Sequence, residues 1–358
     1  MNQFKTSLAM RLFLLGFMLI SLSISAIGQD TIMARNLDLS PKAESFYNQG
    51  VQMLLEDSYE MAIGAFDVAI EMNSGFYKAY LNRGIAKMKA NYNYEAINDF
   101  DKLINLEKEL DKAYFNRGLC KDKLGKNKEA LNDWEKSLEI NEKNVDAHYF
   151  VGQRYFLKKD YVKALSHLKK ANDFASPRAN VFNDMAAAYR MLERYEKSIS
   201  CYNSAIEIEP EKALYYANLG GLNKKIKNFN EAIKSYNKAI SLDNTVFNSF
   251  NNRGSVYFEL QEFEKAENDF SKAIKINNKR ANAYNNRGTS RMKLGKYDEA
   301  IADFDSAILI DGKFAIAYAN RAVVKEIIYD IKGACEDWTK AELLGFKTVI
   351  KYIQEQCQ

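Results

Sequence analysis

Apolar residues recur along this chain at three- and four-residue spacing, separated by short polar stretches, from about residue 43 to residue 346. Such spacing places the apolar side chains on one face of a helix, so the pattern predicts a series of amphipathic helices. Breakers such as Gly125, Gly295 and Asn228 stand between successive helices and predict turns. The sequence therefore predicts an all-α fold built from helix pairs.

The pattern has a fixed period of 34 residues without an insertion. It is marked by small residues: Gly50, Gly84, Gly118, Gly152, Ala186, Gly220, Gly254, Gly288 and Ala322. In the same register, alanine or serine stands twelve residues later, and an aromatic residue or leucine sixteen residues later. Small residues let two helices approach closely and aromatic rings fill the gaps beside them. A period of this length is typical of a solenoid, in which neighbouring repeats share one core.

The period and its aromatic, glycine and alanine columns resemble the tetratricopeptide repeat family over Ala43 to about Phe346. The family's late proline is present only as Pro210. The resemblance implies a right-handed superhelical solenoid of nine helix-turn-helix repeats over residues 43–346, whose first helices line a concave groove. These repeats begin at Ala43, Tyr77, Asp111, Val145, Ala179, Ala213, Phe247, Ala281 and Ala315.

The two ends of the chain differ from the repeats. Residues 1–28 combine a basic start, an apolar run and small residues before a possible cleavage point, which predicts a signal peptide. A retained segment would instead associate the protein with a membrane. Residues 29–42 are interpreted as a linker, in which Ser40 and Pro41 favour a helix start. Residues 347–358 have helical spacing and predict a C-terminal capping helix.

Composition and charge narrow the possible partners. The 358 residues are 47% apolar with three prolines, which suits a single repeat array. Removal of residues 1–28 lowers the formal net charge from +4 to +2 because Lys5 and Arg11 are lost. A nucleic-acid-binding array needs a basic stripe, so the near-neutral charge argues against a nucleic-acid partner.

Arginine and aspartate co-occur in five repeats. In each of them, arginine stands directly before the small residue, and aspartate stands fifteen residues after the small residue. Because repeats that lack the arginine also lack the aspartate, the pattern predicts structural ion pairs between the two helices of a repeat. The pairs are Arg83 with Asp99, Arg117 with Asp133, Arg253 with Asp269, Arg287 with Asp303, and Arg321 with Asp337.

Asparagine stands two residues before the small residue in seven of the nine repeats. Its helix propensity does not explain this recurrence. An amide both donates and accepts, and the resemblance implies that this column faces the groove, where asparagines can hold a peptide backbone. Hydrogen bonding between neighbouring helices or to water explains the column equally well. The candidate peptide-binding asparagines are Asn82, Asn116, Asn218, Asn252, Asn286 and Asn320.

The lining of the expected groove is apolar in the first four repeats and polar in repeats seven and eight. In the first four repeats its lining is expected to include Tyr47, Val51, Leu81, Ile85, Phe115, Leu119 and Tyr149. These side chains either pack together or, if exposed, suit an apolar peptide or an amphipathic helix. In repeats seven and eight the matching places hold Asn248, Asn251, Ser255, Asn282, Asn285 and Thr289.

Cysteines predict one structural bond. Cys335 and Cys357 lie ten residues before and twelve after Gly345, so two antiparallel helices turning there would bring them to similar heights. A disulfide between them would suit an oxidising compartment. Cys120 and Cys201 are expected to be buried thiols, and no cysteine pair has metal-ligand spacing.

The sequence indicates a non-enzymatic protein. It holds no nucleophile elbow and no glycine-rich phosphate loop, so we expect no catalytic residue, no metal, no cofactor and no small-molecule substrate. The leading hypothesis is an exported scaffold, periplasmic or secreted, that binds a peptide or protein segment in its groove. The alternative is a structural subunit of an envelope complex, engaged through its ends or its convex face.

Overall fold

The computed structural model describes residues 40–107 and 110–357. The expected signal peptide and residues 29–39 of the expected linker lie outside them. The described residues form nineteen α-helices and one short 3-10 helix, and none of them lies in a strand. The helices α2 to α10 are Pro41–Leu55, Tyr59–Met72, Tyr77–Lys89, Asn93–Leu106, Asp111–Lys123, Asn127–Ile140, Val145–Leu157, Tyr161–Asp173 and Ala179–Met191. Helices α11 to α19 are Tyr195–Ile208, Ala213–Lys225, Phe229–Leu242, Phe247–Glu259, Phe263–Ile276, Ala281–Lys293, Tyr297–Ile310, Ala315–Ile327 and Ile331–Leu343.

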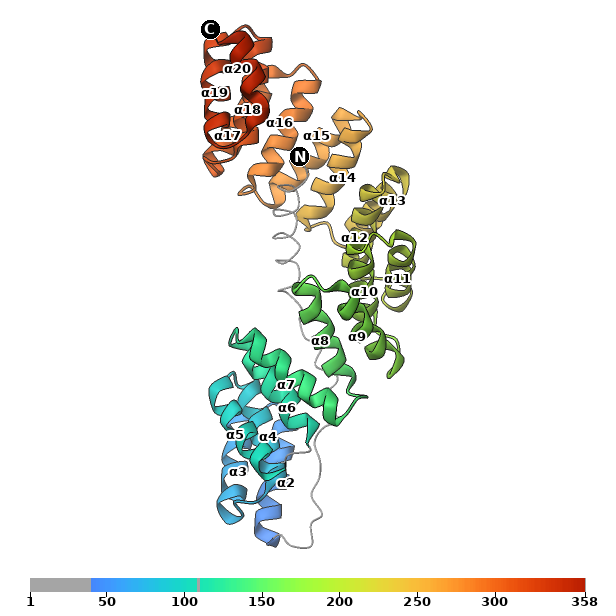
Figure 1. The fold of residues 1–358 in the computed structure, drawn as a ribbon, viewed down its shortest axis with the longest axis vertical. Coiled ribbons are helices and arrows are strands. Elements are labelled where there is room, and N and C mark those ends of the chain that lie inside the picture. The colour runs from blue at the N-terminus through green and yellow to red at the C-terminus, as the bar shows by residue number, and fades with distance from the viewer. Residues whose placement is uncertain (1–39, 108–109, 358) are drawn as a thin grey trace. The chain divides into compact units, whose positions relative to one another are not determined.

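The described residues divide into two compact units, one up to Arg154 and one from Tyr155 onward, and the boundary falls within α8. In the first unit α2 packs on α3, α4 on α5, and α6 on α7 (Figure 1). Each pair also packs on the next, α3 against α4 and α5 against α6. The first helices α2, α4 and α6 contact one another in sequence.

The second unit repeats the same arrangement. Helix pairs α10/α11, α12/α13, α14/α15, α16/α17 and α18/α19 follow one another, and the second helix of each pair packs on the first helix of the next (Figure 1). Contacts also join α12 to α14, α14 to α16, and α16 to α18. The predicted all-α fold of tandem helix pairs is confirmed.

Close helix contact depends on the small residue of each repeat. A Cβ atom added to Gly84 would lie 2.7 Å from the ring of Phe100, and one added to Gly50 would lie 2.7 Å from Phe66. Both rings are fully buried. The aromatic ring sixteen residues later therefore packs directly on the glycine backbone, as the sequence pattern predicts.

The turn inside each repeat needs a left-handed residue. Gly125 and Gly295 both have φ of 75°, and glycine adopts this conformation at little cost. The same turn position in the other repeats holds Asp57, Asn91, Lys159, Glu193, Lys227, Gln261 and Tyr329, all at positive φ. In the sixth repeat the left-handed residue is thus Lys227, whereas Asn228, expected to be the breaker, precedes the next helix.

Two elements follow the last helix pair: the 3-10 helix Lys347–Val349 and α20, Ile350–Gln356. Val349 is buried, and the ring of Tyr352 stacks on Trp338 of α19 with the centroids 5.3 Å apart. A disulfide joins Cys335 of α19 to Cys357, with 5.6 Å between their Cα atoms. These contacts cover the apolar side of the final repeat.

Candidate functional site

Arginine joins the two helices of a repeat in all five predicted places. Arg83 donates from Nε and Nη2 to the two carboxylate oxygens of Asp99, at 3.0 and 2.6 Å. The other four pairs form the same two-bond fork, with Nη2–oxygen distances of 2.6 or 2.7 Å. The aspartate side chains are at most 7% exposed, so each carboxylate is buried beside its guanidinium.

The same arginines also reach back to the preceding repeat. Arg83 Nη1 donates to Asp67 at 2.6 Å, and Arg117 Nη1 donates to Asp101 at 2.6 Å. In the second unit the corresponding partners are Asn237 for Arg253, Ser271 for Arg287 and Asp305 for Arg321. Each guanidinium therefore connects three helices from two repeats.

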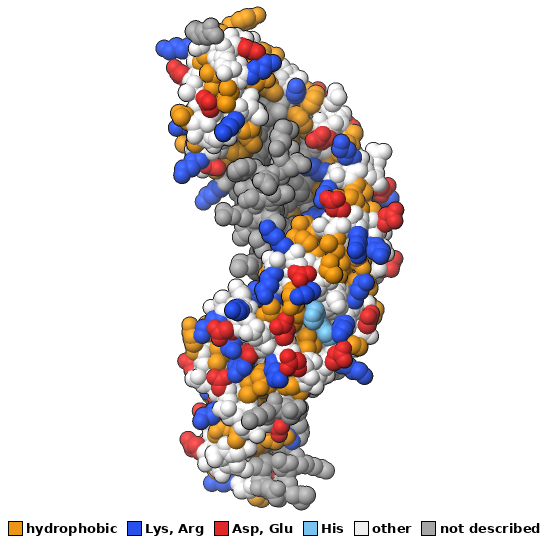
Figure 2. Space-filling model, in the orientation of Figure 1, with side chains coloured by type: hydrophobic (Ala, Val, Ile, Leu, Met, Phe, Trp, Pro, Cys, Tyr) orange, Lys and Arg blue, Asp and Glu red, His pale blue; other side chains and the backbone are white. Residues whose placement is uncertain are grey.

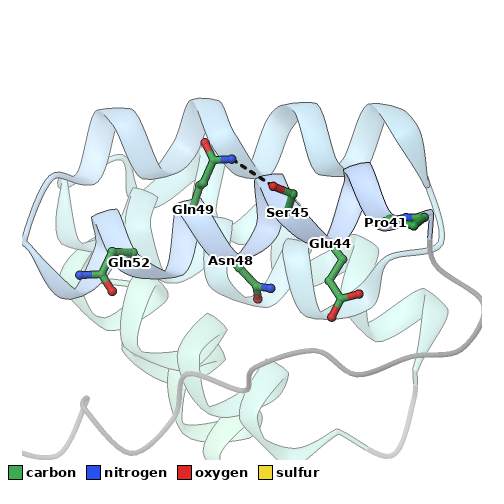
Figure 3. Close-up of a pocket in the computed structure, with 6 residues that line it drawn as sticks. All are labelled: Pro41, Glu44, Ser45, Asn48, Gln49 and Gln52. Carbon is green, nitrogen blue, oxygen red and sulfur yellow. Dashed lines mark hydrogen bonds between the residues drawn. The ribbon is translucent and has the colours of Figure 1, made fainter.

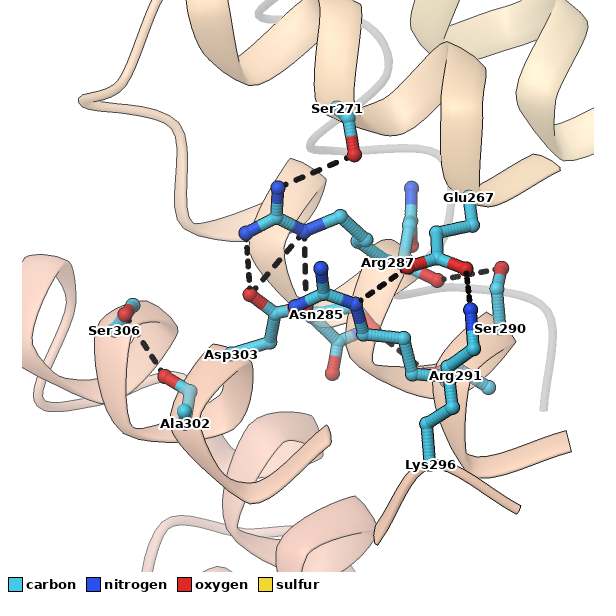
Figure 4. Close-up of polar contacts among 12 residues, drawn as sticks. Glu267, Ser271, Asn285, Arg287, Ser290, Arg291, Lys296, Ala302, Asp303 and Ser306 are labelled. Carbon is cyan, nitrogen blue, oxygen red and sulfur yellow. Dashed lines mark hydrogen bonds and ion pairs between the residues drawn. The ribbon is translucent and has the colours of Figure 1, made fainter. Parts of the chain in front are cut away.

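A second cation, which the sequence analysis missed, approaches four of the five aspartates. Figure 4 shows Arg287 and Arg291 converging on Asp303, and Arg291 Nη1 lies 2.9 Å from that carboxylate. Arg291 also bonds Glu267, which accepts from Lys296 at 2.7 Å. The equivalent cations in other repeats are Lys87 for Asp99, Lys121 for Asp133 and Lys325 for Asp337. Asp269 is the exception, because Tyr257 occupies that column.

In four of the five pairs the carboxylate raises the pKa of the guanidinium. Burial alone would lower the pKa of Arg83, but the bonds to Asp99 and Asp67 outweigh it and raise the pKa. The same balance raises the pKa of Arg117 and Arg253. For Arg321 the bond to Asp337 is the largest cause of its raised pKa. The pairs hold the repeats together, and the charged groups of each pair are engaged with one another.

The asparagine column is mostly used between helices. Asn218 donates to Asn183 at 2.8 Å, Asn286 to Asn251 at 3.3 Å and Asn320 to Asn285 at 2.9 Å. In each case the acceptor belongs to the first helix of the preceding repeat. Asn82 follows the same geometry and donates to the Tyr47 hydroxyl at 2.9 Å. Interhelix bonding, one of the two interpretations left open by the sequence, accounts for these four amides.

Asn116 and Asn252 lack such an acceptor because the preceding repeat has Leu81 or Ala217 in its place. Asn116 donates instead to the Lys112 carbonyl of its own helix. Within the described residues no hydrogen bond involves the Asn252 amide, which is half-buried. Asn252 is thus the member of the column best placed to bond a partner.

The structure corrects the expected apolar lining of the first repeats. Tyr47 is fully buried, with its ring centroid 4.8 Å from that of Phe76, and Tyr149 is also buried. Asn82 is 1% exposed, so it cannot reach a bound peptide either. Phe115 is half-buried and contacts Phe150. Val51, Leu81 and Ile85 are buried as well, whereas Leu119 is only partly buried, like Phe115. Most of this set is therefore core and not a docking surface.

The polar residues expected to line the groove in repeats seven and eight, on α14 and α16, are partly accessible. It consists of Asn248, Asn251, Asn252, Ser255, Asn282, Asn285, Asn286 and Thr289, which we call the amide face. Asn251 and Asn285 are buried acceptors for the next repeat, while the other six are half-buried or exposed. Ser255 and Thr289 bond their own helix backbone. The amide face presents donors and acceptors on a fixed helical frame.

A shallow depression lies on the outer surface of α2 (Figure 3). Its lining consists of Pro41, Glu44, Ser45, Asn48, Gln49 and Gln52. Ser45 and Gln52 are exposed, although their counterparts one period later, Ala79 and Ala86, are buried. This polar surface is what the outer face of a terminal repeat requires. All six residues come from one helix, and nothing in their arrangement indicates chemistry.

The free thiols are inert. Burial raises the pKa of Cys120 to about 12 and that of Cys201 to about 11, so both stay protonated at neutral pH. Among the described residues, no group of three or more His, Cys, Asp and Glu side chains could hold a metal ion. No helix in residues 40–107 and 110–357 has the length and apolar character required to cross a bilayer.

Family models match four stretches of the chain. The tetratricopeptide repeat models match residues 111–144, 281–314 and 177–245, and a TPR repeat model matches residues 254–295. The chain is a tetratricopeptide repeat protein. Members of this family are generally non-catalytic and typically bind protein or peptide partners, so this protein is placed among interaction scaffolds.

Solved structures agree on the fold. The C-terminal part of a TPR repeat-containing protein from Cytophaga hutchinsonii is 15% identical with a TM-score of 0.56, covering 67% of this chain and 98% of that one. PilF of Pseudomonas aeruginosa is 18% identical with a TM-score of 0.52, covering 59% and 96%. A tetratricopeptide repeat protein from Parabacteroides merdae is 18% identical with a TM-score of 0.51, covering 70% and 99%. A search of curated proteins gives no match.

Proposed function

We propose that the protein is an exported scaffold that binds an extended peptide or protein segment across the amide face of α14 and α16. The observation that carries this proposal is the Asn252 amide, half-buried on a first helix and without a hydrogen bond in the described part of the chain. An amide in this position can pair with a peptide backbone whatever the side chains of the peptide are. Such pairing gives affinity without narrow sequence specificity.

The charges of the surface support a protein partner. Lys and Arg side chains are interspersed with Asp and Glu over the visible face in Figure 2. A mixed surface lacks the basic stripe that nucleic-acid binding uses. Many charged side chains instead form ion pairs within and between repeats. Arg287 and Arg291 pair with Asp303 of their own repeat, and Arg291 also pairs with Glu267 of the preceding repeat.

We propose that the protein is located in the cell envelope. The Cys335–Cys357 disulfide supports this assignment because such bonds persist in oxidising compartments. The apolar segment within residues 1–28 also supports it, since it has the length and flanking residues of an export signal.

The test compares an asparagine on the first helix of a repeat with an asparagine on the second helix. Mature protein (residues 29–358) is used to capture envelope proteins from the native host, as wild type, Asn252→Ala and Asn268→Ala. Asn268 is exposed on the second helix α15 and serves as the matched control. We expect Asn252→Ala to lose captured proteins that the other two retain, without a change in thermal stability. Equal capture by all three would contradict binding at the amide face.

A second candidate is a structural subunit engaged through the end of the array. Leu309 and Leu343 occupy a column that is polar in the other seven repeats, yet they are 88% and 78% exposed. Exposed leucines in matching places of the last two repeats favour contact with another protein. In that case Leu309→Asp/Leu343→Asp would abolish capture and Asn252→Ala would not.

A further inference from the structure

Leu309 and Leu343 lie in the same place of the last two repeats, near the C-terminal ends of the second helices α17 and α19. Their side chains are 88% and 78% exposed. The other seven repeats hold a polar residue there: Glu71, Asn105, Glu139, Asp173, Glu207, Ser241 and Lys275. The two leucines therefore replace a solvated column of the array with exposed apolar surface.

Each leucine adjoins a residue that is apolar in every repeat. Ile310 follows Leu309 and is 38% exposed, and Leu344 follows Leu343 and is half-buried. Helix α18 packs on both α17 and α19, so the two pairs lie on neighbouring hairpins at the C-terminal end of the array (Figure 1). We call these four residues, Leu309, Ile310, Leu343 and Leu344, the leucine edge.

The charges around Leu309 are mainly negative. Within four residues on either side, the charged side chains are Asp305, Asp311 and Lys313, all exposed. Asp305 also pairs with Arg321 of α18 and keeps 52% of its side chain exposed. Asp311 accepts a hydrogen bond from the backbone N–H of Lys313 at 3.0 Å, a neutral donor that does not cancel its charge. This side of the leucine edge is therefore acidic.

The charges around Leu343 have the opposite balance. Within the same distance along the chain they are Lys340, Glu342 and Lys347, of which Glu342 is half-buried and the two lysines are exposed. In the part of the chain that the structure describes, neither lysine forms an ion pair. This side of the leucine edge is therefore basic.

We infer that the leucine edge is the contact surface between two copies of this chain. A two-fold axis that sets Leu309 of one copy against Leu343 of the other also sets the acidic side of each copy against the basic side of the other. The edge is thus complementary to itself in apolar surface and in charge, which favours a second copy over an unrelated protein. The inference rests on the second candidate function, engagement through the last repeats, and names the partner.

The arrangement closes at two copies. The outer surface of α2 is polar at Ser45 and Gln52, and residues 347–357 cover the apolar side of the final repeat. Copies therefore cannot extend the array by stacking their end repeats, whereas a two-fold contact uses the same surface of both copies. Because only two strongly exposed side chains per copy contribute, we expect a weak dimer with a dissociation constant in the micromolar range.

Sedimentation velocity of the mature protein (residues 29–358) over a series of micromolar concentrations measures this association. We expect the mass to rise from that of one copy toward that of two. Leu309→Asp and Leu343→Asp should each raise the dissociation constant about tenfold or more, because a carboxylate would have to leave water against an apolar side chain. The control Leu214→Asp, at a position 46% exposed on α12, should leave it unchanged. All three positions are exposed, so the unfolding temperatures should stay close to that of wild type.

Crosslinking tests the two-fold arrangement. Leu309→Cys and Leu343→Cys are prepared separately, and a short bis-maleimide is added to each variant alone and to their mixture. Cys120 and Cys201 are buried and Cys335–Cys357 is a disulfide, so only the introduced thiols should react. We expect covalent dimers in the mixture and few with either variant alone. Equal yields in the three samples would contradict the pairing of Leu309 with Leu343.

Neutral variants test the contribution of charge. Lys340→Gln/Lys347→Gln should weaken the dimer about fivefold, and the difference from wild type should shrink at high salt. The control Lys212→Gln/Lys332→Gln removes two exposed lysines away from the leucine edge and should have no effect. The same dissociation constant for both double variants would overturn the charge complementarity on which the choice of a second copy rests.

The outcomes separate this inference from the functions proposed above. A monomer at every concentration, or a dimer that neither Leu309→Asp nor Leu343→Asp weakens, would overturn it. If such a monomer captured an envelope protein through the two leucines, the edge would belong to that protein and the second candidate function would stand. Leucine-dependent binding of the monomer to phosphatidylglycerol vesicles would assign the edge to a lipid surface instead. Asn252→Ala should leave the dimer unchanged, so the test of the amide face has an independent result.

Discussion

The guanidinium of Arg287 and the carboxylate of Asp303 are joined by a two-bond fork, with Nε 2.9 Å and Nη2 2.6 Å from the two oxygens. The pair links α16 to α17, and Nη1 of the same arginine donates to Ser271 of α15. One side chain thus fixes the geometry inside its repeat and the geometry to the previous repeat. Because the motif occurs five times, it is a major determinant of how successive repeats stack.

Arginine removal should cost most where the aspartate has no second cation. Arg253→Met leaves Asp269 buried and unpaired, with an expected loss of about 4 kcal/mol in the free energy of unfolding. Arg287→Met leaves Arg291 beside Asp303, so we expect a loss of about 2 kcal/mol. Urea unfolding followed by helical circular dichroism measures both.

These two variants are closely matched. Each arginine also bonds one neutral side chain of the preceding repeat, Asn237 or Ser271. On its own helix Arg253 lies over the rings of Phe250 and Tyr257, and Arg287 over that of Tyr284. Equal losses in the two variants would show that the second cation does not compensate the buried carboxylate.

Glycine at the helix contact should tolerate no side chain. Gly84→Ala places a Cβ atom 2.7 Å from the buried Phe100 ring, so we expect a loss of about 2 kcal/mol in the free energy of unfolding. Gly64→Ala on the exposed side of α3 has no atom within 4 Å and should gain about 0.5–1 kcal/mol through helix propensity. A loss at Gly64 or none at Gly84 in thermal unfolding would contradict this packing.

The terminal disulfide should stabilise the last elements of the array. Cys335 and Cys357 close a loop of 22 residues, and its opening by Cys357→Ser should cost about 3 kcal/mol. Because a repeat contacts only its neighbours, the effect should concentrate in α20 and α19. Amide hydrogen exchange measures it, and unchanged protection of α19 would refute a stapling role.

Acid should weaken the contact between α15 and the next repeat. Burial alone would raise the pKa of Glu267, but the bonds from Lys296 and Arg291 outweigh it and lower the pKa below its ordinary value of 4.5. A depressed carboxylate stabilises the fold above that value and loses its contribution as the pH falls through the folded-state pKa. The stability difference between wild type and Glu267→Gln should therefore be present at pH 7 and shrink below pH 4.5.

Urea unfolding of wild type and Glu267→Gln at several pH values measures this stability difference. A difference that stays constant between neutral and acidic pH would mean that the charge of Glu267 does not contribute to the contact with Arg291 and Lys296.

Internal repetition made most of the fold predictable from the sequence. Nine copies of one pattern reveal which columns vary together, so the partners of Arg83 and Arg287 followed without a structure. The second cation could also have been found, because Lys87, Lys121, Arg291 and Lys325 occur only in repeats that have the ion pair.

Accessibility was harder to predict because it depends on adjacent repeats. Tyr47 occupies a column expected to line a groove, yet Phe76, directly before α4, and Asn82 of the following repeat cover it. The asparagine column has the same limitation, since the role of each amide is set by the residue 35 positions earlier. Asn286 donates to Asn251, whereas the matching position for Asn252 holds Ala217, which has no acceptor in its side chain.

Photo-crosslinking in the native host tests most directly whether the amide face binds another chain. A benzoylphenylalanine replaces Asn252 on α14 in one strain and Asn268 on α15 in another, and crosslinked products are identified by mass spectrometry. The account predicts adducts with a defined protein segment from position 252 and none from position 268. Adducts from position 268 alone would contradict it.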